Sequence, residues 1–512
     1  MKKFLKFIFS RLVFVGLALI FQIVWIMIFA WKMSTYYNYI NILLGVLGFI
    51  AVLRIINKWD NPSYMLAWSI VILLIPIFGI TLYIMFGRSG LTRWNRKKFA
   101  AVHDTYSDDL RQNQDVLNEL KNNDASVARQ SEYINDYAGY PLYKNTSTKY
   151  YSSGEDMFVD MLKAIKEAKH YIFLEFFIIS KGEMWDTILE LLIEKVKEGV
   201  DVRLIYDDVG CVNLLPAKYY KELQKVGIKC AAFNPFRPVV SVVMNNRNHR
   251  KILDIDGHTA FTGGINLADE YINKEVRFGY WKDAGIRIQG DGVWNFTIMF
   301  LEMWHYVTGI VENDRSIYKA DRYVQSKIES DGFVQPYSDS PLDKENVGEN
   351  VYLNIINKAR DYVYIYTPYL IIDNEMMTAL CLAAKSGIDV KIITPGIPDK
   401  KIVYLLTQSY YERLICAGVE IYQYTPGFVH AKCFVSDDRI ATVGSVNLDY
   451  RSLYHHFECA AYMYGTKCIN QIESDFRKTA AVCRRVTHET IKHEKKSLKL
   501  LGFVMKGFAP LM

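Results

Sequence analysis

The sequence predicts an α/β protein in which an N-terminal transmembrane helical region precedes two similar lobes, each a mixed sheet flanked by helices. Three observations predict this organisation. Long apolar runs fill the first 98 residues. Beyond them, strand-like apolar runs alternate with segments of helical periodicity, the pattern of layered α/β folds. A short polar motif occurs twice with matching downstream residues, which indicates an internal repeat and a pseudo-twofold pair of lobes.

The composition allows several domains and an anionic partner. The chain has 512 residues, of which 51% are apolar, and a formal net charge of +6. This small excess favours a phospholipid or nucleic-acid partner only mildly, and ordinary scatter explains it equally well. The eight cysteines form no C-x-x-C pair and show no ligand-like spacing with histidine. We therefore expect reduced thiols in a cytosol-facing domain, with no disulfide framework and no metal site.

Three apolar runs are candidates for membrane helices: residues 12–31, 40–56 and 66–86. The first and third reach the roughly 20 residues that a helix needs to cross a bilayer. The second is shorter and contains Gly45 and Gly48, so it could be tilted, re-entrant or interfacial. Pro76 should kink the third run, and Gly79 would ease the bend. No small-residue cleavage site follows the first run, so we expect no cleavable signal peptide.

Positive charge predicts the orientation in a membrane. Five basic residues follow the third run and place the large lobes on the cytoplasmic side: Arg88, Arg93, Arg96, Lys97 and Lys98. Basic residues before the first run place the N-terminus on the same side, which requires an even number of crossings. Because three runs are present, the number of crossings and the side of the N-terminus stay open.

The predicted domains are a membrane region at 1–98, a polar, partly helical linker at 99–135, and lobes at 136–330 and 331–512. In the first lobe we expect helices at 156–169, 184–198 and 219–226 and strands at 171–179, 201–206 and 229–233. The second lobe repeats this order, with helices at 350–359, 376–386 and 409–417 and strands at 362–366, 389–394 and 420–424.

The repeated motif is His-x-Lys-x4-Asp with downstream Gly or Ser and Asn. The first copy consists of His249, Lys251, Asp256, Gly264 and Asn266. The second consists of His430, Lys432, Asp437, Ser445 and Asn447, and each residue follows its counterpart by 181 positions, since 249 + 181 = 430. One copy alone would be a weak signal, whereas two matched copies are a strong one.

Two segments near the motifs have two interpretations each. Gly227 corresponds to Gly418 at an offset of 191, ten more than 181, so the first lobe carries about ten extra residues near 236–246. Their apolar part, 239–244, is either a core strand or a lip that reaches lipid. The tail at 498–512 is either an amphipathic segment on the membrane or a segment packed on a lobe.

The motif residues suit phosphoryl transfer. Residues i and i+2 of a strand face the same side, so the histidine and lysine of each copy project together. Two lysines can neutralise the non-bridging oxygens of a phosphodiester, and Asn266 and Asn447, with Gly264 and Ser445 beside them, can bind it. Two histidines provide a nucleophile and a general acid on opposite sides of phosphorus. This chemistry requires no metal and no other cofactor.

Four carboxylates have supporting roles in this prediction. Asp256 and Asp437 complete the catalytic motifs but lie at odd spacing from their histidines, so we expect them to stabilise the local structure. A catalytic imidazole needs an acceptor for its other nitrogen, and Asp283 and Glu458 are the candidates. The alternative for each is a surface carboxylate.

The doubled motif resembles that of the phospholipase D superfamily, and the chain resembles the bacterial cardiolipin synthases within it. The supporting stretches are FTGGINLADE at 261–270, VGSVNLDYRS at 443–452 and the Asn61-Pro62 turn before the third apolar run. The resemblance implies that two phosphatidylglycerol molecules give cardiolipin and glycerol through a phosphohistidine. It also implies that His249 is the nucleophile and His430 the general acid/base, and that the protein lies in the bacterial inner membrane.

Three other functions remain open at this stage. Water as the acceptor would make the protein a phospholipase D, and another alcohol would make it a different phosphatidyltransferase. A membrane-tethered nuclease would need a basic, aromatic-lined groove. A lipid-binding scaffold without activity conflicts with two intact motifs. We expect phosphatidylglycerol and other anionic lipids as partners and no nucleic acid. The sequence does not determine the oligomeric state, with which a homodimer is compatible.

Overall fold

The computed structural model describes residues 20–22, 24–25, 28, 35–58, 61–87, 90–235, 246–322, 328, 330–343, 345–492 and 496–511. The chain divides into two units. A helical unit comprises 1–97, 236–245 and 504–512, and an α/β unit comprises 98–235 and 246–503. Each unit is described by itself.

The helical unit contains α3 (Thr35–Ile56), α4 (Pro62–Leu74) and α5 (Pro76–Leu82). The Asn61 side chain caps α4 by accepting a hydrogen bond from the backbone N–H of Ser63, and Pro62 occupies the first turn, where its missing N–H costs nothing. The third apolar run therefore breaks at Ile75 into α4 and α5, with a π-helical segment at Tyr83–Gly87 after them, which confirms the bend predicted at Pro76.

The two short helices lie close together. A Cβ on Gly79 would come within 2.6 Å of the Ile72 backbone, so only glycine permits this approach. Val52, Ile55, Trp68 and Ile72 form a small apolar core between α3 and α4. Across the described residues, no helix combines the length and hydrophobicity that a membrane crossing requires. The run at 12–31 lies almost wholly outside the described residues.

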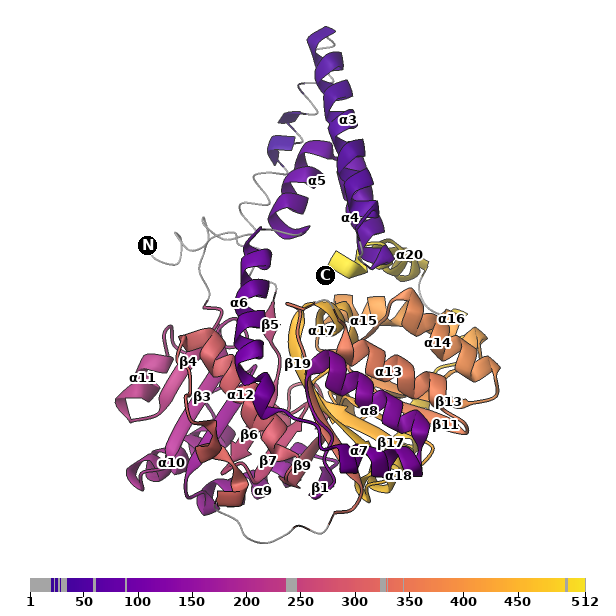
Figure 1. Ribbon diagram of the computed structural model, residues 1–512. Helices are drawn as coiled ribbons and strands as arrows, with labels where there is room; N and C mark the ends of the chain where they lie inside the picture. Colours follow the sequence, from indigo (N-terminus) through magenta and orange to yellow (C-terminus); the bar gives the residue numbers. More distant parts are fainter. Residues whose placement is uncertain are drawn as a thin grey trace. The chain divides into compact units, whose positions relative to one another are not determined.

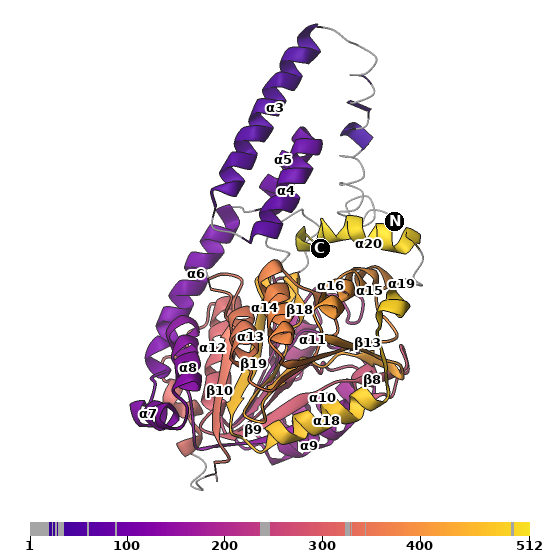
Figure 2. The same cartoon turned by 90° about the vertical axis from the view of Figure 1, so that its right-hand side faces the viewer.

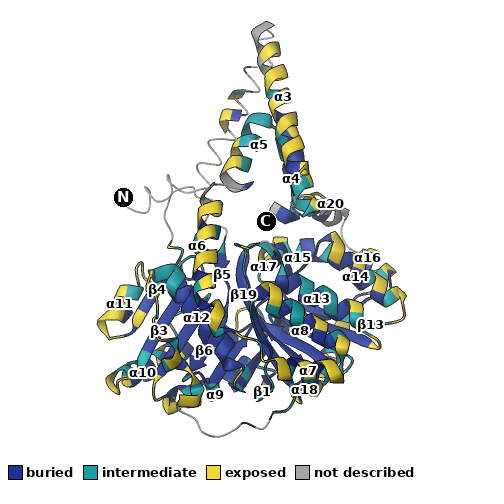
Figure 3. Ribbon diagram, viewed as in Figure 1, coloured by how far each residue is buried: buried dark blue, intermediate teal, exposed yellow. Residues whose placement is uncertain are grey.

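Apolar side chains also cover the outside of α3. Leu43, Phe49, Ile50 and Ile56 are all exposed, and most of the helix is coloured as exposed in Figure 3. A continuous exposed apolar surface of this kind is unusual on a helix of a soluble protein.

The predicted polar linker is mainly helical. It contains the end of α6 (Gly90–Tyr106), then α7 (Gln114–Asn123) and most of α8 (Ala125–Ala138). Asn113 and Asp124 cap the last two helices through their side-chain oxygens. Because α8 packs against α13 (Val347–Lys358) and β10 (Phe333–Asp339), it belongs to the α/β unit.

Two sheets with the same strand order form the α/β unit (Figure 1). Among the described residues, the first has the order β1-β9-β7-β6-β2-β3-β4. Its strands are β1 (Thr146–Tyr151), β2 (Tyr171–Phe176), β3 (Asp201–Asp207), β4 (Lys229–Phe233), β6 (Lys251–Ile255), β7 (Thr259–Gly263) and β9 (Gly285–Gly290). The main path of the second is β10-β19-β17-β16-β11-β13-β14-β20. Its strands after β10 are β11 (Tyr362–Tyr366), β13 (Asp389–Pro395), β14 (Glu420–Tyr424), β16 (Cys433–Ser436), β17 (Ile440–Gly444), β19 (His456–Tyr464) and β20 (Cys483–Arg485).

The two sheets are mixed, as predicted. In the first, β2, β3 and β4 are parallel, whereas β6, β7, β9 and β1 pair antiparallel. Seven consecutive strands of the second sheet correspond one to one to the strands of the first. The correspondence starts with β10, which matches β1, and ends with β14, which matches β4. We call the halves built on these sheets the first and second lobes.

Helices flank the sheets and join the lobes. The first lobe has α9 (Gly154–Glu167), α10 (Glu183–Lys197), α11 (Tyr220–Lys225) and α12 (Val293–Thr308). The second has α13, α14 (Asn374–Lys385), α15 (Lys401–Gln408), α16 (Tyr411–Cys416) and α18 (Cys468–Ala481). One helix of each lobe also packs on the other lobe: α12 contacts β10, beside which it lies in Figure 2, and α18 contacts β1. The two lobes therefore pack directly against each other.

Most predicted elements are confirmed within a few residues, and β4, β11 and β14 have the predicted ends. The strand expected at 171–179 ends early, at Phe176, because the backbone of Ile178 turns to bond the Asn266 side chain. The extra segment at 236–245 lies outside the described residues. The tail forms α20 (Lys496–Lys506), on which Leu500, Leu501 and Val504 are exposed. All eight cysteines, each within the described ranges, are free thiols.

Candidate active site

The segment before each motif histidine pairs with a strand of the other lobe. In the first lobe, β5 (Arg247–Asn248) pairs in parallel with the start of β19. In the second, β15 (Gly427–Val429) pairs in parallel with β8 (Tyr280–Lys282). The backbone N–H of His249 then donates to the carbonyl of Phe457 at 2.9 Å, and that of His430 to the carbonyl of Lys282 at 2.7 Å. Each motif is thus held against the opposite lobe.

This strand pairing between the lobes gives each histidine a carboxylate from the other lobe. Nδ1 of His249 lies 2.9 Å from Oε1 of Glu458, and Nδ1 of His430 lies 2.8 Å from Oδ2 of Asp283. Both carboxylates are fully buried, and the histidines are 6% and 7% exposed. The contact orients each ring and leaves Nε2 as the nitrogen for chemistry.

Burial and these contacts set the charges of the pairs. Burial lowers the pKa of His249 to about 3, against the opposing effect of Glu458. Burial and then Lys432 lower the pKa of His430 to about 4, although Asp283 opposes both. Burial would raise the pKa of both carboxyl groups, but the histidines hold each below its usual value. At neutral pH the site therefore has neutral imidazoles beside ionised carboxylates.

The two motif lysines lie beside their histidines. Nζ of Lys251 donates to the carbonyl of His249 at 2.5 Å, and Nζ of Lys432 lies 2.9 Å from Nδ1 of His430. Burial lowers the pKa of Lys251 to about 7 and that of Lys432 to about 8. Lys432 contributes to the low pKa of Lys251, and Lys251 to that of His430, so the two half-sites share one electrostatic environment.

Gly264 and Ser445 contact the carboxylates. The Ser445 hydroxyl donates to Glu458, and a Cβ on Gly264 would lie 2.1 Å from Oδ1 of Asp283. Asp283 also accepts from the backbone N–H of Ala284 at 2.8 Å. These two predicted substrate-binding positions therefore shape the His–carboxylate pairs.

The two motif asparagines differ in what they bind. Oδ1 of Asn266 accepts from the N–H of Ile178 at 3.0 Å, and its Nδ2 donates to the Tyr271 hydroxyl at 2.7 Å. Asn447 is 5% exposed, and its Oδ1 has no hydrogen-bond partner within the described ranges. In the second lobe the side-chain oxygen of the motif asparagine is thus unused within the described ranges, whereas that of Asn266 is bonded.

Asp256 and Asp437 lie in the turns after β6 and β16 with positive φ angles of 53° and 55°. The Asp256 carboxylate accepts from three backbone N–H groups, those of Lys169, His170 and Tyr171. Asp437 does the same for Arg360, Asp361 and Tyr362. Both carboxylates therefore fasten a turn to the start of a central strand.

Two buried acids that the sequence analysis did not single out hold the first motif. Asp207, the last residue of β3, accepts from the N–H of Asn248 at 3.0 Å and pairs with Arg247 at 3.2 Å. Glu175 of β2 accepts from Nδ2 of Asn248 at 2.7 Å. An acidic residue inside or at the end of an otherwise apolar strand is the signal that could have found them.

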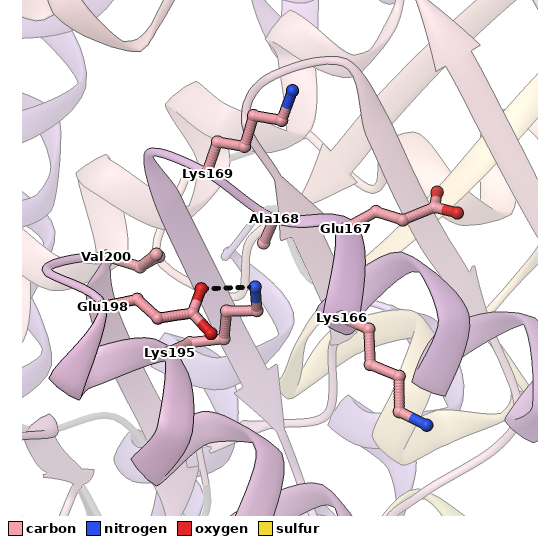
Figure 4. Close-up of a pocket in the computed structure, with 7 residues that line it drawn as sticks. All are labelled: Lys166, Glu167, Ala168, Lys169, Lys195, Glu198 and Val200. Carbon is pink, nitrogen blue, oxygen red and sulfur yellow. Dashed lines mark hydrogen bonds and ion pairs between the residues drawn. The ribbon is translucent and has the colours of Figure 1, made fainter.

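A cavity of about 610 Å³ lies elsewhere in the first lobe, near the C-terminal ends of α9 and α10 (Figure 4). Its lining consists of Lys166, Glu167, Ala168, Lys169, Lys195, Glu198 and Val200. Lys195 is already paired with Glu198 at 2.7 Å, and no motif residue takes part. We assign it no role in the chemistry.

Comparison with known proteins agrees with this geometry. The family model described as cardiolipin synthase, PLD-like domain, matches residues 161–277 and 352–480, which span both motifs. The model described as phospholipase D-nuclease N-terminal matches 46–88. The structure of phosphatidylserine synthase from Haemophilus influenzae aligns with 75% of this chain and 97% of that chain at a TM-score of 0.55, and its 15% identity makes this a likeness of fold alone.

Three relatives match over nearly their full length. The cardiolipin synthase of Alkalihalophilus pseudofirmus is 33% identical over 88% of this chain and 90% of that protein. Cardiolipin synthase 1 of Bacillus cereus is 32% identical over 97% and 99%. A Streptococcus mutans protein described as uncharacterized is 48% identical over 90% and 99%.

The fold and the paired site define a phosphatidyltransferase with phospholipase D-like domains. Within that class, the chain belongs to the cardiolipin synthase family.

Proposed function

We propose that this chain is a cardiolipin synthase that transfers a phosphatidyl group from one phosphatidylglycerol to another, giving cardiolipin and glycerol. The observation that carries the proposal is the crossed pair of contacts, His249 with Glu458 and His430 with Asp283. In-line displacement needs a nucleophile and a general acid on opposite sides of one phosphorus, and two half-sites that are each completed by the other lobe can supply one group each.

In the first step, Nε2 of His249 attacks phosphorus. The bond from phosphorus to the headgroup glycerol breaks, and the leaving alkoxide takes a proton from Nε2 of His430. Glu458 stabilises the positive charge that develops on His249. The bound anionic phosphodiester favours the protonated form of His430, which is mostly neutral in the free protein.

In the second step, His430 is neutral and takes the proton from a headgroup hydroxyl of the second phosphatidylglycerol. That oxygen attacks phosphorus, the bond to His249 breaks, and cardiolipin forms. Lys251 and Lys432 neutralise the non-bridging oxygens in both steps, and the Nδ2 amide group of Asn447 donates a hydrogen bond to them. A hydrolase would differ only in using water as the acceptor.

The proposal places the reaction at the bacterial inner membrane, with the lobes in the cytoplasm. Three features support this location: the exposed apolar side chains along α3, those of α20, and the basic residues that follow the third apolar run. Phosphatidylglycerol is anionic and keeps its acyl chains in lipid, so a membrane-attached enzyme meets both substrates in the bilayer plane.

The test uses the full chain in mixed micelles with phosphatidylglycerol labelled in its phosphate. Labelled cardiolipin with release of free glycerol supports the proposal. Phosphatidic acid as the sole labelled product would make the protein a hydrolase. His249→Ala should abolish the labelled phosphoenzyme, whereas His430→Ala should slow both steps and still allow some label to be trapped. Label that persists in His249→Ala would contradict the nucleophile assignment.

A further inference from the structure

His456 is a third histidine at the site, and the chemistry above leaves its ring unused. It begins β19 and is 9% exposed, and its ring centroid lies 5.5 Å from that of His249. Both ring nitrogens are enclosed, and neither has a hydrogen-bond partner in the described part of the chain. Nδ1 is 3.7 Å from Oε1 of Glu458, beyond hydrogen-bond distance. Enclosed polar groups are nearly always paired, so this ring indicates a group that acquires its partner from the substrate.

The backbone presets the position of this ring. His456 pairs with Arg247 in the contact between β19 and β5, the same contact that holds His249 against the second lobe. The two imidazoles are therefore placed together by one piece of strand pairing. The strand pairing therefore fixes how the two rings lie relative to each other.

The other half-site has a different ring in the corresponding place. Trp281 precedes Asp283 by two residues, as His456 precedes Glu458. Its ring lies 5.3 Å from that of His430, and its Nε1 is 3.4 Å from Oδ2 of Asp283. An indole has one polar ring atom, which here faces the carboxylate, whereas an imidazole has two ring nitrogens. The half-sites therefore differ in one hydrogen-bonding group, on the His249 side.

We propose, on the basis of the function proposed above, that His456 is a further catalytic residue, which donates a hydrogen bond to a non-bridging oxygen of the phosphodiester at His249. One ring nitrogen faces Glu458, and the other donates to the phosphoryl oxygen. No covalent bond to His456 forms, and no proton leaves it. The hydrogen bond stabilises the charge on the equatorial oxygens while the bond between phosphorus and His249 forms and breaks.

The surrounding charge favours an anion over a cation. Ligand atoms of His249, His456 and Glu458 lie within 4.8 Å of one another and could in principle hold a metal ion. However, Lys251 and Lys432 are buried at the same site, and the positive charge of their protonated forms would repel a divalent cation. A phosphodiester satisfies both lysines and the His456 ring together.

The experiment compares wild type with His456→Phe, which keeps a ring without nitrogens, and His456→Gln, which keeps a donor. The rate of phosphoenzyme formation from labelled phosphatidylglycerol should fall about 10- to 100-fold in His456→Phe and less in His456→Gln, with KM within threefold of wild type. His258→Phe is the matched control. His258 is a half-buried histidine of the first lobe that contacts Thr259, and its replacement should change the rate less than twofold.

A second readout separates catalysis from a structural defect. Two phosphatidylglycerol diastereomers with sulfur in place of one non-bridging oxygen report which oxygen each enzyme contacts. The wild-type preference between them should shrink at least fivefold in His456→Phe. An unchanged preference would overturn the inference, as would zinc-dependent activity that a chelator removes from wild type but not from His456→Phe. Failure of wild type to make cardiolipin would instead contradict the proposed function.

Discussion

Glu458, in the second lobe, accepts a hydrogen bond from Nδ1 of His249, in the first lobe. His430 of the second lobe makes the reverse contact with Asp283 of the first, so each lobe supplies a carboxylate to the histidine of the other. Neither lobe alone provides the carboxylate that contacts the imidazole of its own motif. The active site therefore depends on correct packing of the two lobes, to which the pairs β5–β19 and β15–β8 both contribute.

Replacing Glu458 by Gln should remove the charge that orients His249 while keeping the size of the side chain. The amide can hydrogen-bond Nδ1 in the wrong tautomer, so the rate of phosphoenzyme formation should fall about 10²- to 10⁴-fold. Rapid-quench trapping of labelled protein measures this rate. Glu349→Gln, at a buried carboxylate that bonds Tyr454 elsewhere in the second lobe, is the control and should stay within threefold of wild type. Equal losses in both variants would contradict the orienting role.

The pH dependence of kcat/KM should follow the loss of positive charge from Lys251 and Lys432. The free-enzyme pKa of Lys251 is about 7 and that of Lys432 about 8, so each is charged below its value and neutral above it. An anionic substrate needs the charged forms, and kcat/KM should therefore fall as pH rises from 6 to 9, by roughly tenfold for each lysine. Lys251→Arg should keep only the later fall near pH 8. A flat wild-type profile over this range would show that the lysines do not control binding.

Asp256→Ala should act on stability more than on chemistry. The change leaves three backbone N–H groups without their carboxylate and puts alanine at a φ of 53°. We expect a loss of about 2–3 kcal/mol in the free energy of unfolding, which a lower Tm in detergent would reveal. Asp256→Asn should lose less, since asparagine tolerates this backbone conformation. An unchanged Tm with lost turnover would assign the carboxylate a part in the reaction.

Much of the fold could be predicted because the signals are local. Apolar runs predicted β4, β11 and β14 with their observed ends, and Pro76 predicted the break between α4 and α5. The Phe176 end of β2 could not be predicted in this way. The bond from the Ile178 backbone to Asn266 that accompanies it joins residues 88 positions apart, and local periodicity carries no information about such a contact.

The sequence predicted which residues gather at the candidate site, but not which carboxylate contacts which histidine. The doubled motif identified both histidines and both lysines, and charge near the motifs identified Asp283 and Glu458 as acceptors. Which acid serves which histidine depends on the exchange of strands between lobes, which leaves no trace in spacing. The unpartnered state of the His456 ring is likewise a property of packing, because the sequence does not show which groups surround a histidine at the start of a strand.

The two motif asparagines should respond differently to the same substitution. Asn266 uses Oδ1 for Ile178 and Nδ2 for Tyr271, so Asn266→Ala should lower the Tm by several degrees as two buried hydrogen bonds are lost. Asn447 has an unpartnered Oδ1 within the described ranges, so Asn447→Ala should leave the Tm within about two degrees. Its effect should appear in kcat, with a loss of roughly tenfold, because one hydrogen bond to the phosphodiester is missing. Thermal unfolding and steady-state cardiolipin synthesis on the same preparations measure both. The opposite result would be a loss of kcat with an unchanged Tm in Asn266→Ala and a lower Tm with an unchanged kcat in Asn447→Ala. It would assign the structural role to Asn447 and the substrate-binding role to Asn266, contrary to the hydrogen bonds.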